Sequence, residues 1–209
     1  MISTSLTLEE IMTSRKSIRK YDPTKKIAKD TIYKIIQLAT TAPSSWNLQH
    51  WKFIIISDER VKEKLFPIAF KQEQVTSCSH LIIVLGDKHA YKNADEIFSY
   101  QVRKGYMSED AKIAQIENIK YAYQANQEKY EVHDAIRNSS LAAMQLMLAA
   151  KSYGIESCPM LSFKEVELID ELKISNRYLP VMMISLGYAA KPPYETVRLP
   201  VNKVILQEY

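Results

Sequence analysis

Residues 134–153, DAIRNSSLAAMQLMLAAKSY, decide which class of fold this chain can adopt. A helix built from this segment has little polar face, because apolar side chains stand on most of its turns: Ile136, Leu141, Met144, Leu146, Met147 and Leu148. Such a helix needs neighbouring elements to cover it. Gly154 follows directly, where glycine commonly caps a helix C-terminus. The segment therefore predicts a central, buried helix.

Strand-forming segments lie on both sides of this helix in the sequence. Residues 51–57 (WKFIIIS) and 80–86 (HLIIVLG) are dense in β-branched and aromatic residues and predict two buried strands. Residues 181–187 predict a third strand. A few strands separated by long helices indicate an α+β protein.

The N-terminal third of the chain predicts helices joined by extended segments. Thr7 and Glu10 form a capping box, so we expect a helix that runs to about Ser14, followed by an extended segment over 17–21. A second helix begins near Asp30 and ends before Pro43, since the residue before proline avoids helical geometry. Asp58 is placed to cap a short third helix.

Two later segments have helical character but few core residues. Residues 93–130 are polar and tyrosine-rich, and we expect one or two exposed helices that form a flap. Ser162 and Glu165 have capping-box spacing and predict a further helix start. The proline-punctuated residues 190–209 predict an extended C-terminal arm. We expect residues 1–209 to form a single domain.

Composition excludes several classes of function. The chain has 209 residues, 46% of them hydrophobic, and a net charge of +4, which is far below the clustered excess of a nucleic-acid-binding protein. No apolar run is long enough to span a membrane, and the first residues do not resemble a signal peptide. The two cysteines, Cys78 and Cys158, have no zinc-site or disulfide-framework spacing. We therefore expect a soluble cytoplasmic protein with no nucleic-acid or membrane partner.

The glycines and histidines exclude further chemistry. The four glycines are scattered, so neither a G-x-G-x-x-G dinucleotide loop nor a P-loop is possible. Side chains must then hold any phosphate-bearing ligand. Cys78 and His80 are close in sequence, but they precede a buried strand, and packing is a better interpretation there than a metal site.

The first candidate binding motif is residues 15–21, RKSIRKY. In an extended segment Arg15, Ser17 and Arg19 point to one side, and two guanidiniums that flank a hydroxyl can clamp a phosphate. Taken alone, such a basic run is more commonly solvated surface.

The second motif is residues 42–51, APSSWNLQHW. Two serines, an asparagine and a glutamine place several hydrogen-bonding groups in one loop, as a flat heteroaromatic ligand requires. Taken alone, an ordinary turn of Ser, Asn and Pro would explain the same composition.

Together the two motifs are specific. R-x-S-x-R-x-Y after the first helix, followed by P-S-S-x-N-x-Q-x-W, resembles the nitroreductase family of FMN proteins, and most closely its short bacterial NAD(P)H nitroreductases. Further features occur in matching order: the 70–74 segment, Tyr153-Gly154-Ile155 with Pro159, Leu186-Gly187-Tyr188, and Arg198-Leu199-Pro200. The resemblance covers roughly Glu9 to Ile205.

The resemblance implies a nitroreductase-like fold, with a central mixed or antiparallel sheet flanked by helices, in an intertwined homodimer with shared active sites. It implies an enzyme that passes hydride from NADH or NADPH through flavin N5 to nitroaromatic, quinone or similar small-molecule acceptors by a ping-pong mechanism. No catalytic side chain and no metal ligand is expected. The implied FMN-binding residues are Arg15, Lys16, Ser17, Arg19, Lys71, Gln74, Leu161, Ser162 and Arg198, joined from the other subunit by Pro43, Ser44, Ser45, Asn47 and Gln49.

Three positions depart from the family pattern. His50 stands where the family usually has proline, Gln74 where some members have lysine, and Leu161-Ser162 where an acidic or glycine pair is common. Two other functions remain open: an FMN-binding or storage module without turnover, and a divergent reductase such as a dehalogenase.

Overall fold

In the computed structural model, which describes residues 6–209, one antiparallel sheet has the strand order β1-β2-β4-β3. The strands are β1 (Trp51–Ile56), β2 (His80–Asp87), β3 (Glu156–Met160) and β4 (Tyr178–Gly187). The α-helices are α1 (Leu8–Ser14), α2 (Lys29–Ala39), α3 (Glu59–Ile68), α4 (Glu73–Ser77), α5 (Ala94–Arg103), α6 (Glu109–Ala125), α7 (Asp134–Ser152) and α8 (Glu165–Leu172). The predicted α+β class is confirmed.

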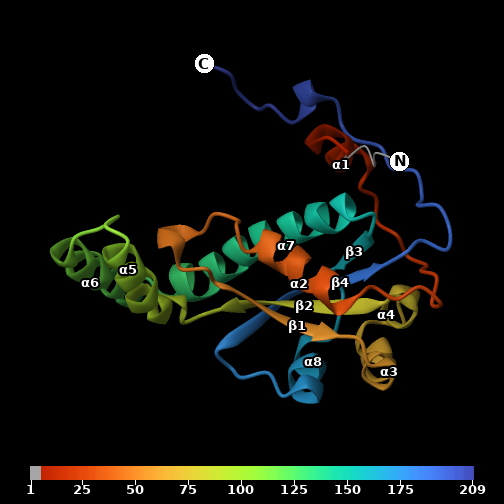
Figure 1. Ribbon diagram of the computed structural model, residues 1–209, viewed down its shortest axis with the longest axis horizontal. Helices are drawn as coiled ribbons and strands as arrows, with labels where there is room; N and C mark the ends of the chain where they lie inside the picture. Colours follow the sequence, from red (N-terminus) through yellow and green to blue (C-terminus); the bar gives the residue numbers. More distant parts are fainter. Residues whose placement is uncertain (1–5) are drawn as a thin grey trace.

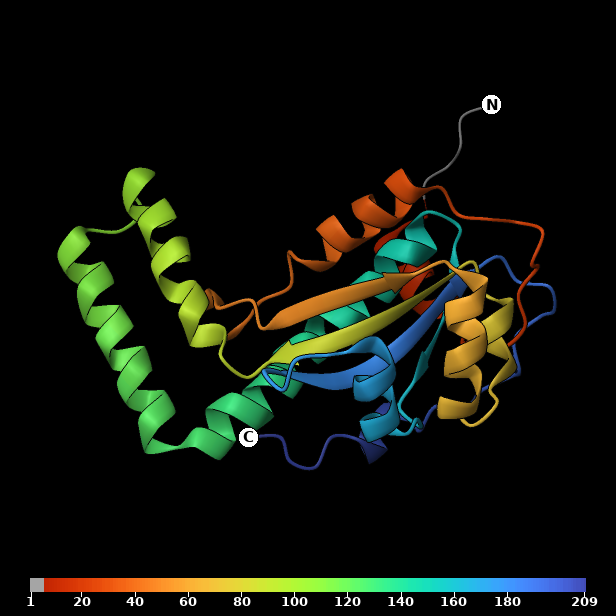
Figure 2. The ribbon, with the colours of Figure 1, turned by 90° about the horizontal axis from the view of Figure 1, so that it is seen from below.

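The sheet lies between two helical layers (Figures 1 and 2). Leu81 and Ile83 of β2 pack in one core with residues of α3, α4 and α8, whereas Ile82 and Val84 pack in the other with residues of α2 and α7. Successive strand residues point to opposite faces, so a strand covered on both faces must be apolar throughout. The apolar run in β2 is therefore explained by its central place.

The predicted burial of residues 51–57 is only partly right. β1 is an edge strand, and only its first and last residues, Trp51 and Ile56, are buried. Its apolar composition matches that of β2, but an edge strand has a neighbour on one side only.

The predicted burial of α7 is also right for only one side. Ala142, Ala143 and Leu146 face the sheet and are fully buried, and Gly154 takes the expected left-handed cap conformation, with φ +70°. The opposite face is apolar yet exposed: Ile136, Leu141 and Met144 are 41–48% accessible in the single chain.

Of the other local predictions, some are confirmed and some are wrong. The Thr7–Glu10 capping box and the Asp58 cap are confirmed. The Ser162–Glu165 capping box is wrong: α8 is capped at Lys164, whose backbone N–H is tied to the Ile68 carbonyl at 2.9 Å. This bond leaves Ser162 in the preceding loop. β4 also begins at Tyr178, three residues earlier than predicted, and β3 and α4 were not predicted.

The close fit of Gly187 against Tyr21 gives a testable packing prediction. A Cβ at Gly187 would lie 2.7 Å from Cδ1 of Tyr21, whose ring is 1% exposed. The ring cannot easily move, because its hydroxyl donates to the Ser185 carbonyl at 3.0 Å. We expect Gly187→Ala to lower the free energy of unfolding by about 1–3 kcal/mol in urea denaturation. In a Tyr21→Ala background the same change should cost little, and an equal loss in both backgrounds would contradict this cause.

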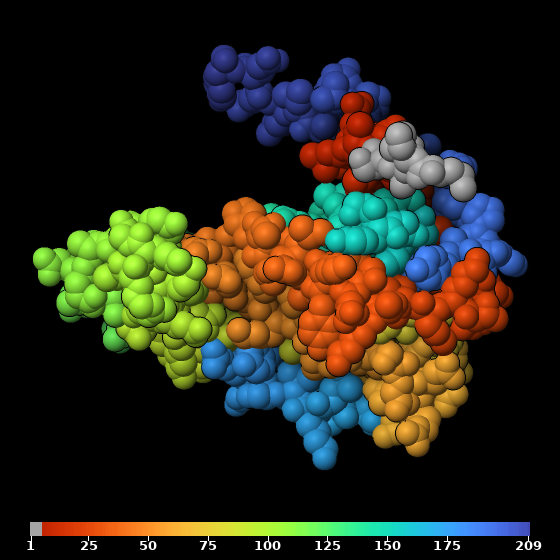
Figure 3. Space-filling view, viewed as in Figure 1, coloured from red at the N-terminus to blue at the C-terminus, as the bar shows by residue number. Residues whose placement is uncertain are grey.

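Two segments leave the body of the molecule. Helices α5 and α6 project from one end of the sheet (Figure 2), and the last residues stand off the body on the side of α1 (Figure 3). Many apolar side chains of this C-terminal segment are exposed, among them Val197, Leu199, Val201 and Leu206. Within residues 6–209, the helices are all too short or too polar to cross a membrane.

Candidate functional site

The basic segment of residues 15–21 contacts β3 at Ser157 and pairs at its end with Ala189, beyond β4. Arg15 is the C-terminal cap of α1, and Ser17 forms an isolated parallel bridge with Ser157 of β3. The Ile18 N–H donates to the Ser157 carbonyl at 3.1 Å, and the Ile18 side chain is buried in the core. These contacts fix the backbone of Ser17, which stands between Arg15 and Arg19 in the sequence.

The same place carries positive charge and unpaired polar groups. Nη1 of Arg15 and Oγ of Ser157 are buried and have no hydrogen-bond partner among the residues that the structure describes. Burial raises the pKa of the neighbouring Cys158 thiol, while the charges of Arg19 and Arg15 act in the opposite direction. Buried polar groups normally have partners, so this site suits an anionic ligand.

The C-terminal arm passes over this segment. The Arg19 guanidinium lies 5.4 Å from the centroid of the Tyr194 ring, and Lys16 pairs with Glu195 at 3.7 Å. Arg198 follows a few residues later, exposed, with Nη1 donating to the Val197 carbonyl at 2.9 Å. The structure thus brings the arm to the segment, but it does not place Arg198 on Arg15 or Arg19.

Two further predicted segments meet beside the end of β3. Nε2 of Gln72 donates to the Ser162 carbonyl at 2.9 Å, and Nε2 of the buried Gln74 donates to Oε1 of Gln72 at 3.0 Å. Lys71 is exposed with φ +58°, and Leu161 is 72% exposed. Sequence reasoning missed Gln72, which joins the two segments.

The two groups of residues lie near the two ends of β3. Ser157, beside the basic segment, and Leu161, just past the strand, are four residues apart, or about 13 Å in extended chain. One chain therefore offers a cationic end and, farther along, a group of amides.

The loop of residues 43–49 is held by hydrogen bonds that its backbone N–H groups donate to side chains. Ser45 N–H donates to Oδ1 of Asn138 at 2.9 Å, and the Gln49 N–H donates to Oγ of Ser44 at 3.0 Å. Pro43 and Asn47 are exposed. Asn138 lies on α7, far away in the sequence, so the motif itself carried no sign of it.

The structure does not bring this loop to the basic segment. The loop contacts Asn138 near the beginning of α7, whereas the basic segment adjoins Ser157, beyond the end of α7. Asn138 stands 14 residues before Ser152, the last residue of α7, which corresponds to a rise of about 21 Å. Within one chain Ser45 and Ser157 are therefore held near opposite ends of the central helix, although Pro43, at the start of the loop, lines a pocket with Ile11 of α1.

His50, which follows the loop, is fully buried. Its Nε2 lies 3.2 Å from the Tyr123 hydroxyl of α6. Burial lowers the pKa of His50 to about 4, against the opposing effect of Asp134 and Asp87. The ring is therefore neutral at pH 7.

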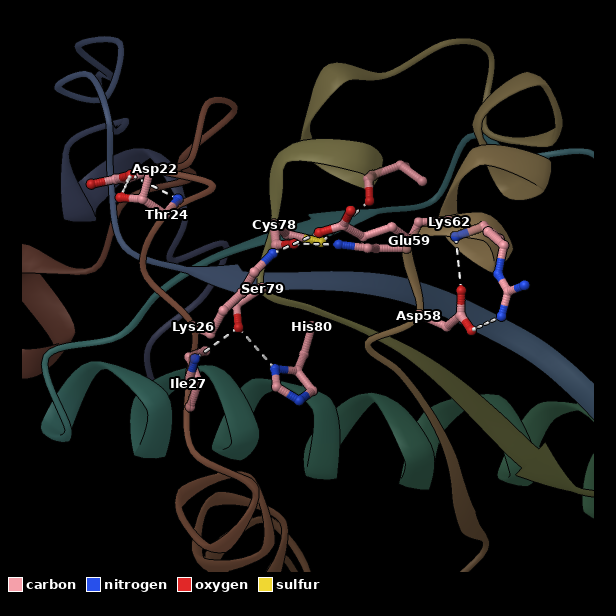
Figure 4. Close-up of polar contacts among 12 residues, drawn as sticks. Asp22, Thr24, Lys26, Ile27, Asp58, Glu59, Lys62, Cys78, Ser79 and His80 are labelled. Carbon is pink, nitrogen blue, oxygen red and sulfur yellow. Dashed lines mark hydrogen bonds and ion pairs between the residues drawn. The ribbon is translucent and has the colours of Figure 1, made fainter.

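Cys78 and His80 take part in hydrogen bonds within the fold (Figure 4). Nζ of the buried Lys62 donates to the Cys78 carbonyl at 2.7 Å, and the Ser79 hydroxyl contacts Nδ1 of His80 at 3.0 Å. Among residues 6–209, no group of three or more His, Cys, Asp or Glu side chains is arranged to hold a metal ion.

Comparison with known proteins gives the family. The model of the nitroreductase family matches residues 12–188. A Bacillus subtilis protein named "Putative NAD(P)H nitroreductase YodC" is 38% identical over 195 residues, which cover 93% of this chain and 96% of the relative. The chain belongs to the nitroreductase family, a family of oxidoreductases.

Two further relatives extend the comparison. The crystal structure of a protein from Exiguobacterium sibiricum, described as a putative nitroreductase in complex with FMN, is 34% identical with a TM-score of 0.91 and full coverage of both chains. The CLA biosynthesis enone reductase of Lactiplantibacillus plantarum is 29% identical over 194 residues, with 91% of this chain and 89% of the relative covered.

Proposed function

We propose that this protein is an FMN-dependent oxidoreductase that passes hydride from NADH or NADPH to a small-molecule acceptor, such as a nitroaromatic or a quinone. The observation that carries the proposal is Nη1 of Arg15, which is buried in a cationic segment beside β3 and has no hydrogen-bond partner among residues 6–209. The FMN complex of the Exiguobacterium relative and the NAD(P)H-dependent name of YodC support it.

The residues along β3 would hold the two ends of FMN. Arg15, Ser17 and Arg19, with Lys16 behind them, would bind the phosphate and ribityl chain, because guanidiniums form charge-assisted bonds to phosphate oxygens. Arg198 would join them from the arm. At the other end of β3, Lys71, Gln74, Leu161 and Ser162 would meet the ring.

A homodimer would complete the site. The distance between the two halves within one chain favours a loop (Pro43, Ser44, Ser45, Asn47 and Gln49) supplied by the other subunit. The exposed apolar face of α7, together with exposed Leu8 and Met12 of α1, is the kind of surface that a second copy covers. Two-fold symmetry would then give two equivalent sites.

When bound, FMN would supply the hydride chemistry, with donor and acceptor taking turns at one face of the ring. The chain would contribute position and electrostatics, since its cations neutralise the phosphate and its amides surround the ring. We place this single-domain protein, with its 93–130 flap and its arm over 190–209, in the cytoplasm, where its two buried free cysteines stay reduced.

The first test is the identity of the cofactor. We expect the purified protein to be yellow and to release FMN rather than FAD, because the cationic segment suits a terminal phosphate and the sequence has no glycine-rich pyrophosphate loop. An absorption spectrum and chromatography of the released chromophore measure this. A colourless protein that takes up no added FMN would contradict the proposal.

The same preparation separates the alternatives. A storage module would hold FMN that NADH and NADPH fail to bleach under anaerobic conditions. An enzyme with catalytic turnover should give parallel lines in double-reciprocal plots of initial rate, as ping-pong kinetics require. The acceptor panel should include an enone beside nitroaromatics and quinones, since one relative is an enone reductase, and a halogenated aromatic to detect a dehalogenase.

A further inference from the structure

The loop before β1 has an unfavourable backbone conformation. Trp46, Asn47 and Gln49 have φ values of +49°, +56° and +53°. This left-handed region is sparsely populated by residues with a side chain, and such residues persist only where the surrounding structure holds them. What holds this loop therefore decides where Asn47 and Gln49 point.

The flap of residues 93–130 makes many of the contacts that fix this loop. Leu48 is fully buried in a cluster with Phe98 of α5 and with Ile119 and Tyr123 of α6. Nδ2 of Asn93, at the beginning of α5, donates to the Leu48 carbonyl at 2.8 Å.

Aromatic contacts add to this cluster. The Trp46 ring lies 5.4 Å from the ring of Tyr130, which stacks on Tyr123 at 5.4 Å. The loop is thus seated on the flap through apolar packing at two of its residues.

His50 adds a hydrogen bond to these packing contacts. Its ring is fully buried, with Nε2 3.2 Å from the Tyr123 hydroxyl, while its backbone carbonyl accepts a bond from the Asp87 N–H at 2.7 Å. The charged groups around it are Asp134 of α7 and Asp87 of β2, and Asp87 is paired with Arg177 at 2.6 Å. A neutral ring therefore bridges the start of β1 and α6.

A proline at position 50 could not do this. Proline has no side-chain donor or acceptor, and it disfavours helical conformations at the residue before it. Gln49, the residue before His50, is in the left-handed region. The histidine is thus compatible with the observed loop conformation and ties it to the flap.

We infer that His50 and Tyr123 are positioning residues that set the conformation of the 44–49 loop by linking it to the flap. The inference rests on the proposed function only in taking this loop as part of the FMN site. Loosening the link should make the loop more mobile and weaken FMN binding, with the fold retained.

Hydrogen exchange tests the link without depending on FMN. In Tyr123→Phe we expect the amides of Leu48 and Gln49, which are hydrogen-bonded within the loop, to exchange about tenfold faster, as the loss of one hydrogen bond implies. The matched control is Tyr130→Phe. It keeps an aromatic ring in the same cluster and loses a hydroxyl that has no bond to the loop, so its exchange should stay unchanged. Equal exchange in the two variants would overturn the inference.

Substitutions at His50 provide the second arm. His50→Leu should raise the dissociation constant of FMN about tenfold, while His50→Gln, which keeps a polar group near the position of Nε2, should recover most of the affinity. The double variant His50→Leu/Tyr123→Phe should be no worse than His50→Leu, since both changes remove one contact. Additive effects would overturn the link. If the wild-type protein binds no FMN, the proposed function fails, and the exchange measurement alone decides the link.

Discussion

Arg19→Glu is expected to purify without flavin and to bind added FMN at least a hundredfold more weakly than the wild type. A charge-assisted hydrogen bond contributes about 1.5–3 kcal/mol, and the new carboxylate adds repulsion against the phosphate. Arg19 is exposed in the single chain and its guanidinium lies over the ring of Tyr194, so the fold should stay cooperative. Fluorescence titration of the apoprotein with FMN measures the affinity, and urea denaturation checks the fold.

Lys20→Glu is the matched control for this change. It alters the charge by the same amount one residue later, where Lys20 pairs with Glu73 at 3.7 Å across an exposed surface. Its FMN affinity should fall far less. Arg198→Glu tests the arm separately and should also weaken binding strongly. If Arg19→Glu and Lys20→Glu bind FMN equally well, Arg19 belongs to the solvated surface.

Co-expression of Arg19→Glu with Asn47→Leu is expected to restore about a quarter of the wild-type activity, although each variant alone is inactive. The reason is the length of α7 between the two predicted halves of the site. In a mixed dimer one site carries both lesions and the other carries neither. Random pairing makes about half of the dimers mixed, so about a quarter of all sites recover.

A second pairing controls for non-specific rescue. Arg15→Glu and Arg19→Glu alter the same half of the site, so every mixed dimer has two damaged sites and no activity should return. If Arg19→Glu and Asn47→Leu also fail to complement, with mixed dimers verified by mass spectrometry, then one chain supplies both halves. That result would contradict the shared site.

Local signals allowed much of the fold to be predicted from sequence. The Thr7–Glu10 capping box and the apolar run of β2 each act over a few residues, and both are confirmed. β3 escaped prediction because Glu156–Met160 has neither β-branched residues nor clear alternation, and it includes Pro159. Pairing with β4 makes it a strand.

The site was predictable only as far as its motifs extend. The motifs identified the basic segment and the 43–49 loop, but not the partners that other elements supply. Asn138 bonds Ser45 of the loop, Tyr123 bonds His50, and Gln72 bonds the Ser162 carbonyl. His50 shows the limit most clearly. Its identity was visible as a departure from the family pattern, whereas its partner lies 73 residues away on α6.

The exposed apolar face of α7 has a consequence for reading genetic data on this protein. If the two halves of each site come from different subunits and this face of α7 is the interface between them, a charged residue introduced at Leu141 or Met144 would separate the chains. All the residues that bind the cofactor would remain unchanged, yet the cells would show the phenotype of a cofactor-binding mutant. Loss-of-function alleles would therefore map to positions outside the cofactor-binding residues, and their common defect would be assembly.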